Sequence, residues 1–179
     1  SNLAHELRQP LSTIESIAYY LELALSEANP KVRAQLERLR DSVAQSDNML
    51  RDALALAQFA PPRPVTVDLD ELFTEFAAPH FDLHLAAAPV TLDFLHARKM
   101  VETICSLFAH YGRVPHRAQV LTGLEPSGHV YVRVSGSGLH VAASSLALQL
   151  LEQIAAANAL SLQVNLRNPE SQEISLEIP

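Results

Sequence analysis

Three polar residues near the start of the chain have types and spacing that suit nucleophilic chemistry: His5, Glu6 and Gln9. A neutral imidazole nitrogen is a nucleophile near pH 7, and a carboxylate beside it can accept a proton or hold the required tautomer. If the neighbouring Leu7 and Leu11 face a partner helix, these three polar side chains point outward. Such a group suits phosphoryl transfer, whereas a solvated surface histidine without chemistry is the simpler alternative.

The surrounding residues predict a pair of long helices. The first 60 residues hold no glycine and few β-branched residues, a composition that favours helix. Apolar residues recur at alternating intervals of three and four, as in the seam of a coiled coil or helical bundle. The seam comprises Leu7, Leu11, Ile14, Ala18, Leu21 and Leu25, then Val32, Leu36, Leu39, Val43, Ser46, Leu50, Ala53 and Ala57. Asn29 and Pro30 suit the start of the second helix, and the short loop before it makes the helices antiparallel.

Two such helices enclose no core, so we expect the hairpin to pair with a second copy in a dimeric four-helix bundle. Pro61, Pro62 and Pro64 end the second helix and separate a domain of residues 1–60 from one of residues 65–179.

The second domain mixes strand and helix patterns, so the fold class is α+β. We expect short strands at 65–69, 81–85 and 90–92. We expect three helices: one that is capped by Asp70 and ends at 77, one at 94–111 that is capped by Asp93, and one at 143–160. We also expect two hairpins, the first of strands 119–124 and 129–135 across the turn 125–128, the second of strands 162–166 and 173–178. These elements predict a mixed sheet with helices on one face.

The string HELRQPL at residues 5–11 resembles the H-box of two-component histidine kinases, and the resemblance extends over the whole hairpin. It includes the proline five residues after the histidine and the long second helix. The resemblance implies that His5 is the phospho-acceptor and that Glu6 is its base. The family often has Thr or Asn four residues after the histidine, where it positions water to dephosphorylate a partner. Gln9 occupies that place here, so phosphatase activity stays open.

The second domain resembles the ATP-binding domain of the same kinases in the order and spacing of its segments. The matching strings are VDLDELF for the first strand and helix, residues 93–111 for the N-box helix, YVRVSGSGLHV for the aspartate-glycine box, SSLALQLLEQIAAANALSLQV for the helix after the second glycine box, and EISLEIP for the last strand. The resemblance implies a reduced α/β sandwich of the histidine-kinase ATPase type.

The residues with which that family holds nucleotide are missing. The family uses N-box asparagine for magnesium, aspartate for the adenine amino group, and glycines beside the triphosphate. This chain has no asparagine between Asn48 and Asn158, no aspartate after Asp93 and no glycine after Gly138. Changing the alignment register creates none of them, so we expect no cofactor and regard the site for ATP and magnesium as lost.

Other residues stand in the places of the missing ones. In our alignment Thr103 and Leu107 replace the asparagines, and Ser135 replaces the aspartate that binds adenine. The segment 136–138, Gly-Ser-Gly, predicts a turn after a strand rather than a phosphate cradle. A divergent nucleotide site with other ligands remains the alternative.

Composition and charge argue against several other kinds of function. A net charge of −7 removes the general electrostatic basis for binding nucleic acid, so we expect no nucleic-acid partner. The single cysteine, Cys105, lies among apolar residues and predicts an inert buried thiol in a reducing compartment. His80 and His84 would hold a metal only on a shared helix face, and a loop and a strand are the better prediction. We expect no metal and a cytoplasmic location, since no apolar run nears the ~20 residues of a membrane helix.

The sequence therefore predicts a dimeric two-component signalling protein in which His5 exchanges a phosphoryl group with an aspartate of a response regulator receiver domain. Without ATP of its own, it takes phosphate from another phosphoprotein. An upstream kinase or sensor domain is a further expected partner. The alternatives are a divergent but active ATP-dependent sensor kinase core and a non-catalytic dimeric regulator. A response-regulator phosphatase using Glu6 and Gln9 is compatible with the main prediction.

Overall fold

The computed structural model describes residues 2–25, 30–77, 81–109, 118–136, 146–168 and 171–179, with the side chains of 2–5 and 109 left aside. The chain forms two compact units, residues 1–58 and residues 59–179. Each is described by itself. The predicted Asn29 cap lies outside the described residues.

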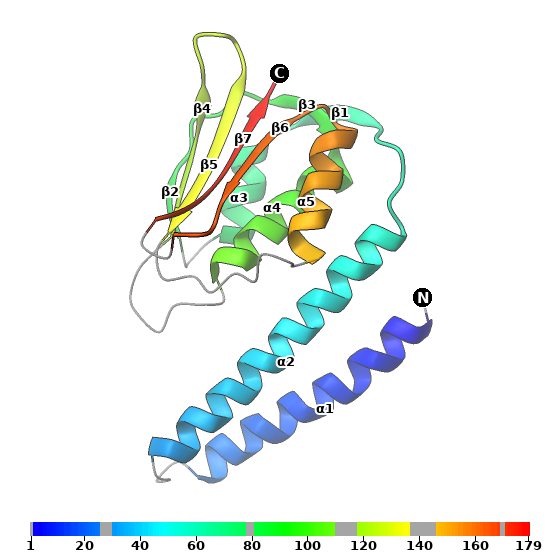
Figure 1. Ribbon diagram of the computed structural model, residues 1–179, viewed down its shortest axis with the longest axis vertical. Coiled ribbons are helices and arrows are strands. Elements are labelled where there is room, and N and C mark those ends of the chain that lie inside the picture. Colours follow the sequence, from blue (N-terminus) through cyan, green and yellow to red (C-terminus); the bar gives the residue numbers. More distant parts are fainter. Residues whose placement is uncertain (1, 26–29, 78–80, 110–117, 137–145, 169–170) are drawn as a thin grey trace. The chain divides into compact units, whose positions relative to one another are not determined.

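The first unit is an antiparallel hairpin of helices α1 (Asn2–Ala24) and α2 (Pro30–Ala57) (Figure 1). Ion pairs join the two helices: Arg8 Nε lies 3.2 Å from Asp47 Oδ1, and Arg40 Nη1 lies 2.8 Å from Glu22 Oε2. The last helical turn closes through Gln58 N–H, which donates to the Leu54 carbonyl, a few residues before the prolines that cannot continue a helix.

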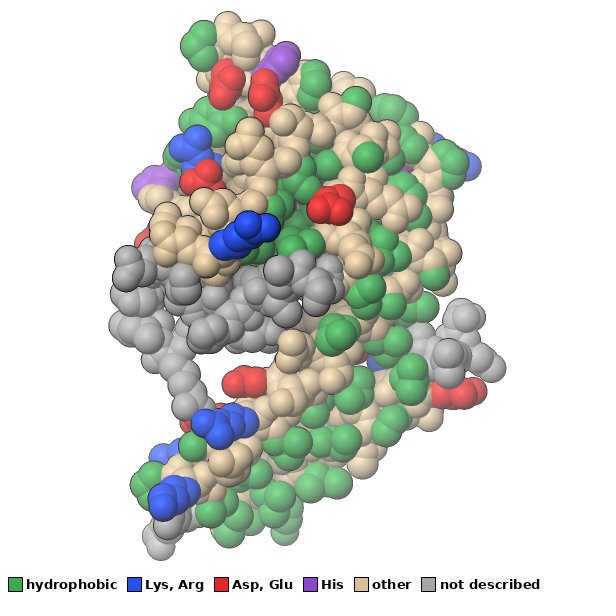
Figure 2. Space-filling view, in the orientation of Figure 1, with side chains coloured by type: hydrophobic (Ala, Val, Ile, Leu, Met, Phe, Trp, Pro, Cys, Tyr) green, Lys and Arg blue, Asp and Glu red, His purple; other side chains and the backbone are tan. Residues whose placement is uncertain are grey.

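Much of the predicted seam is exposed within one hairpin. Ala18 and Val43 are buried, at 0% and 6% exposure. Several larger seam residues are between 36% and 45% exposed: Leu7, Ile14, Leu21, Leu25, Val32 and Leu39. Hydrophobic side chains accordingly gather along the hairpin surface (Figure 2). One copy of the hairpin therefore leaves an apolar face in contact with water.

The second unit is built on two sheets. Strands β1 (Pro64–Val67) and β3 (Val90–Asp93) form an antiparallel pair. The described part also holds a five-stranded sheet in the order β2-β4-β5-β7-β6. Its strands are β2 (Phe81–His84), β4 (Ala118–Leu124), β5 (Val130–Gly136), β6 (Ser161–Asn165) and β7 (Gln172–Ile178). Strand β2 runs parallel to β4 and the other neighbours are antiparallel, which confirms the predicted mixed sheet.

Helices α3 (Leu69–Ala77), α4 (Phe94–Ala109) and α5 (Leu146–Ala157) cover one face of this sheet (Figure 1). Alternate strand residues face them, since successive side chains in a strand point to opposite faces. In β7, for example, Ile174, Leu176 and Ile178 are at most 2% exposed, with less buried residues between them. This unit has a complete hydrophobic core of its own.

The predicted cap of α3 is wrong by two residues. Asp68, not Asp70, accepts the hydrogen bond from Glu71 N–H, at 3.1 Å, so the helix begins at Leu69 and the preceding strand ends at Val67. Asp70 Oδ1 instead accepts from the Thr122 hydroxyl at 2.6 Å. Both Asp68 and Asp70 are residue types that suit an N-cap, and the contact of Asp70 with Thr122 on β4 leaves the cap to Asp68.

The cap of α4 is confirmed, because Asp93 Oδ1 accepts from His96 N–H at 2.9 Å. The turn at 125–128 is confirmed as well. Gly128 has a φ of 88°, and its N–H donates to the Glu125 carbonyl at 2.9 Å. Helix α5 ends at Ala157, three residues earlier than predicted, and residues 143–145 of the predicted helix lie outside the described residues. Residues 110 and 111 of the other predicted helix lie outside the described part.

Candidate functional site

The three residues predicted to carry chemistry lie on the first turns of α1. His5, Glu6 and Gln9 all belong to this helix, and the side chains of Glu6 and Gln9 are exposed. Residues three or four apart on a helix are neighbours, so His5 and Gln9 share one side of α1. The side chain of His5 is not among those described. The exposure of its two companions agrees with the outward orientation expected for them.

Pro10 modifies the backbone at this place. It lies inside α1 and has no N–H to donate to the carbonyl of Glu6, four residues earlier. Just beyond it, the Thr13 hydroxyl donates to the Gln9 carbonyl at 3.0 Å. The first turns of α1 therefore have one main-chain hydrogen bond fewer than a regular helix, directly under the candidate site.

A cluster of three charges lies one helical turn after His5. Asp47 on α2 accepts through Oδ1 from Arg8 Nε at 3.2 Å and through Oδ2 from Arg51 Nη2 at 2.5 Å. We call Arg8, Asp47 and Arg51 the Asp47 cluster. Burial raises the pKa of Asp47, but hydrogen bonds and positive charge from Arg51 and Arg8 outweigh this and hold that pKa below its usual value of 3.8. The carboxylate is therefore ionised and bridges the two helices.

Sequence reasoning missed the Asp47 cluster. The spacing of Asp47 and Arg51 was a usable signal, because oppositely charged residues four apart on a helix commonly pair. The contact with Arg8 depends instead on the register of the two helices, which the seam pattern leaves undetermined.

In the second unit, the places aligned with magnesium-holding asparagines are in the core. Thr103 and Leu107 both lie on α4, at 1% and 8% exposure. The Thr103 hydroxyl has no hydrogen-bond partner in the described part of the structure. Magnesium requires oxygen ligands, which leucine lacks, and the hydroxyl lies inside the core. These two side chains do not fit a magnesium-bound triphosphate.

The place aligned with the adenine-binding aspartate lies on the sheet. Ser135 is half-buried on β5, between Gln119 of β4 and Glu173 of β7. Gly136 ends that strand, and a Cβ there would come within 3.2 Å of the Phe108 ring. Residues 137 and 138 of the predicted turn lie outside the described residues. A serine accepts a hydrogen bond without the charge that an aspartate supplies.

A second polar cluster, also missed from sequence, joins the start of this unit to α4 and the end of α5. The Phe59 ring stacks on the buried His96 ring, with centroids 4.5 Å apart. Asn158 Nδ2 donates to His96 Nδ1 at 3.0 Å, and Arg63 N–H donates to Asp93 Oδ2 at 2.8 Å. Residues 59–63 are thereby packed onto the second unit. The contacting residues are far apart in sequence, so no local pattern indicates them.

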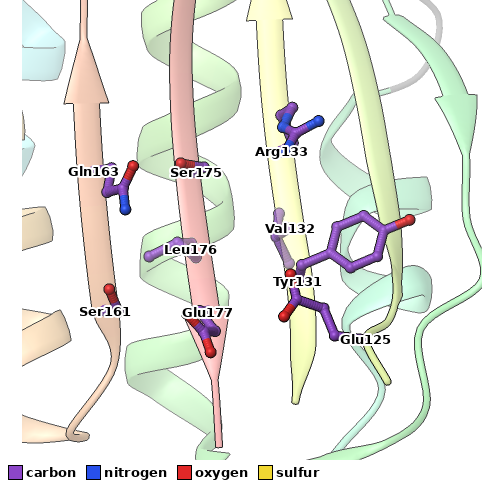
Figure 3. A pocket seen from close by; sticks show the side chains of 9 residues that line it. All are labelled: Glu125, Tyr131, Val132, Arg133, Ser161, Gln163, Ser175, Leu176 and Glu177. Atoms are coloured by element: carbon purple, nitrogen blue, oxygen red, sulfur yellow. The ribbon is translucent and has the colours of Figure 1, made fainter. Parts of the chain in front are cut away.

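The uncovered face of the sheet carries a shallow polar pocket of about 140 Å³ over β5, β6 and β7 (Figure 3). Tyr131, Arg133, Ser175 and Glu177 are among the residues that line it. Glu177 is already engaged with His129, whose Nδ1 lies 2.6 Å from Glu177 Oε1. A polar, hydrated outer face is ordinary for an antiparallel sheet, so the pocket does not by itself indicate a ligand.

Comparisons with known proteins bear on both units. Residues 1–61 match the family model described as the His Kinase A (phospho-acceptor) domain. Among curated proteins, none matches the chain. The hairpin is therefore a His Kinase A (phospho-acceptor) domain, the domain that two-component sensor histidine kinases carry.

Solved structures of histidine kinases share the fold. Full-length ShkA, solved in complex with AMPPNP, is 19% identical with a TM-score of 0.61; the alignment covers 99% of this chain and 44% of ShkA. AdeS of Acinetobacter baumannii is 15% identical with a TM-score of 0.56, over 97% of this chain and 96% of AdeS. The mycobacterial kinase MprB is 14% identical with a TM-score of 0.52, over 65% of this chain and 97% of MprB. At these identities the likeness shows the fold alone. It confirms a helical hairpin followed by a sheet domain like the kinase ATPase domain.

The single cysteine and the predicted histidine pair lie in the second unit. Burial raises the pKa of the Cys105 thiol to about 12, and its side chain is 4% exposed, which confirms a buried thiol. His84 is exposed on β2, and His80 lies outside the described residues. In the described ranges no three His, Cys, Asp or Glu side chains are grouped to hold a metal ion. Of the helices searched there, none has the length and apolarity to cross a membrane.

Proposed function

We propose that this two-component signalling protein is a histidine phosphotransferase: His5 exchanges a phosphoryl group with an aspartate of a response regulator receiver domain. The observation that carries the proposal is the match of residues 1–61 to a phospho-acceptor domain, with the string HELRQPL on the first turns of α1. Glu6 and Gln9, exposed beside His5, support their assignment as base and water-positioning amide.

The transfer needs only groups that the two proteins supply. A neutral ring nitrogen of His5 attacks the phosphorus of the receiver's aspartyl phosphate. The P–N bond forms as the P–O bond to the aspartate breaks, and the aspartate leaves as a carboxylate. The ring becomes positively charged, and Glu6 accepts the proton of its other nitrogen. The reverse sequence returns the phosphoryl group to a receiver.

The phosphoryl group comes from another phosphoprotein rather than from ATP. The core positions of Thr103 and Leu107 support this, because neither presents an exposed oxygen for magnesium. The missing aspartate after Asp93 and the missing glycines after Gly138 support it further. The sheet domain then acts as a scaffold beside the phosphotransfer hairpin.

The working form is a homodimer in which two hairpins make a four-helix bundle. Its support is the exposed seam, since Leu7, Ile14 and Leu21 repeat at seam spacing and are at least 36% exposed in one copy. A second hairpin carries the same stripe, and two such stripes bury each other.

Receiver docking uses a different side of α1. Ile17, Tyr20 and Leu23 are 53%, 69% and 60% exposed, and they repeat every three residues away from the seam. Exposed aromatic and aliphatic side chains in one group are typical of a protein-binding surface. Their place on the same helix as His5 supports a receiver as the protein that binds there.

The test is transfer of label from phosphorylated candidate receivers to the full chain, with and without Mg-ATP. We expect acid-labile label on the wild-type protein with the right receiver, and a loss of at least about 100-fold in His5→Gln, because no other group in the mechanism forms the P–N bond. Arg40→Ala, at the far end of the hairpin, serves as the folded control. Label retained in His5→Gln contradicts the assignment.

An ATP-dependent kinase core is the second candidate. The likeness over 99% of the chain to ShkA, a structure with AMPPNP bound, favours it. If this candidate is right, Mg-ATP alone labels His5, and the nucleotide raises the melting temperature of the protein by mass action. If the first proposal is right, neither happens.

A further inference from the structure

The Asp47 cluster differs in one respect from the ion pair of Arg40 with Glu22. Asp47 uses its two carboxylate oxygens for two different arginines, Arg8 of α1 and Arg51 of α2. The pair at the other end of the hairpin joins Arg40 to Glu22, again across the helices. Two guanidinium groups around one carboxylate leave the cluster with a net charge of +1.

Sharing the carboxylate makes the contact of Arg8 exchangeable. Breaking an ion pair costs much free energy if the carboxylate is left with no cation beside it, and little if a second cation stays in contact with it. Arg51 lies four residues after Asp47 on the same helix and stays in place when Arg8 departs. The side chain of Arg8 is 42% exposed, so it has room to move.

The position of Arg8 on α1 brings it near His5. The two residues are three apart on one helix, which puts their Cβ atoms about 5–6 Å apart. A phosphoryl group on the imidazole adds negative charge and strong acceptor oxygens at that level of the helix. An arginine fork matches phosphate oxygens in geometry and in charge, and such bonds are among the stronger hydrogen bonds in proteins.

We propose that Arg8 changes partner with the phosphorylation of His5: it binds Asp47 in the unphosphorylated hairpin and the phosphoryl oxygens in the phosphorylated one, while Arg51 keeps Asp47 neutralised. Arg8 thus stabilises phosphohistidine by direct contact, and its departure from Asp47 removes an ion pair between α1 and α2. The inference rests on the proposed role of His5 as phospho-acceptor. It adds a signal that passes from the phosphoryl group to the helix pairing.

The test uses the full chain phosphorylated with phosphoramidate, a small donor that modifies histidine without a receiver, and His5→Gln gives the background. We expect Arg8→Ala to lower the equilibrium fraction of phosphorylated His5 by about 3–10-fold, and Arg8→Lys to recover part of it, as one or two charge-assisted bonds at an exposed site imply. Asp47→Asn frees Arg8 and should raise the fraction. Arg40→Ala, which removes a similarly exposed cross-helix pair, is the matched control and should leave it unchanged.

A second measurement does not depend on how well the variants fold. In wild-type protein, the NMR resonance of the Arg8 Nε–H should shift on phosphorylation, while that of Arg40 stays in place. Equal effects of Arg8→Ala and Arg40→Ala, or an unmoved Arg8 resonance in phosphorylated protein, overturn the inference. Phosphoramidate labelling without exchange with any receiver contradicts the proposed function instead, so the two failures are distinguishable.

Discussion

The hairpin of residues 1–58 and the sheet domain of residues 59–179 differ in where their apolar side chains lie. In the hairpin, seam residues such as Ile14 and Leu21 remain 39% and 36% exposed. In the sheet domain, core residues such as Phe73 and Ile154 are at most 1% exposed. One unit is incomplete as a single copy and the other is complete.

The unit with the incomplete core is the one that carries the candidate chemical groups. The incomplete unit has a histidine beside an exposed carboxylate and an exposed amide. In the complete unit, Thr103 and Leu107, which our sequence alignment places opposite the magnesium-holding asparagines of histidine kinases, are packed in the core. The difference teaches that packing and chemistry depend on different side chains, so a complete core does not by itself require an active site.

Removing a large core side chain should destabilise the sheet domain and leave the stability of the hairpin unchanged. We expect Phe73→Ala to lower the free energy of unfolding of the sheet domain by about 3–5 kcal/mol, since a fully buried phenylalanine loses its contacts and leaves a cavity. Chemical denaturation measures it, and Thr74→Ala, at an exposed neighbour, is the control. A loss below about 1 kcal/mol would mean that this core is not well packed.

A charge in the seam of the hairpin should weaken dimerisation. We expect Leu21→Asp to weaken the dimer at least about 100-fold, or roughly 2.7 kcal/mol, because it buries an unpaired carboxylate between hairpins. Leu23→Asp, at an off-seam residue that is 60% exposed, should leave the dimer intact. Analytical ultracentrifugation separates these outcomes. Dimers of equal strength in both variants would show that the seam is not the interface.

The contribution of Thr103 to stability should depend on packing alone, because its side chain is buried in the core. Thr103→Val keeps the shape of the side chain and removes a buried hydroxyl that has no partner in the described part of the structure. We expect a gain of about 1 kcal/mol in unfolding free energy. The control is Thr122→Val, which should destabilise because that hydroxyl donates to Asp70 and accepts from Ala86 N–H. If Thr103→Val destabilises as well, the hydroxyl has a role that the comparison denies.

The end of α5 offers a smaller gain in the same unit. Ala159 has a φ of 55°, a left-handed conformation that costs a residue with a Cβ, and Leu160 N–H donates back to the Ala155 carbonyl at 2.9 Å. We expect Ala159→Gly to stabilise the domain by about 0.5–1 kcal/mol. Ala156→Gly, inside the helix, should destabilise by a similar amount. Thermal melting of both variants decides the matter.

The smallest effect concerns the pH dependence of the hairpin. The depressed pKa of Asp47 means that the ionised form is favoured in the folded state, so its contribution is full above the usual value of 3.8 and is lost as the pH falls through the lower folded value. We expect the free energy of unfolding of the wild-type protein to exceed that of Asp47→Asn by roughly 0.2–1 kcal/mol at pH 7. Chemical denaturation at several pH values should show this difference shrinking below pH 3.8. A difference that stays constant down to pH 2 contradicts an ionised bridge.

Local patterns were enough to predict most elements of the fold. The alternation of the seam predicts both long helices, and the glycine at the end of the turn 125–128 predicts the hairpin that it joins, because each signal lies within a few residues of its effect. Patterns were insufficient where two local solutions compete, as with Asp68 and Asp70 before α3.

The sequence by itself determined the candidate chemistry of this protein. It shows a histidine followed by a carboxylate, and it has no asparagine between Asn48 and Asn158, no aspartate after Asp93 and no glycine after Gly138. Only the tertiary structure decided which distant side chains meet. The contact of Arg8 with Asp47 and the stacking of Phe59 on His96 depend on helix register and on packing between elements. Such contacts form when whole surfaces are buried together, and a single stretch of sequence records only one side of them.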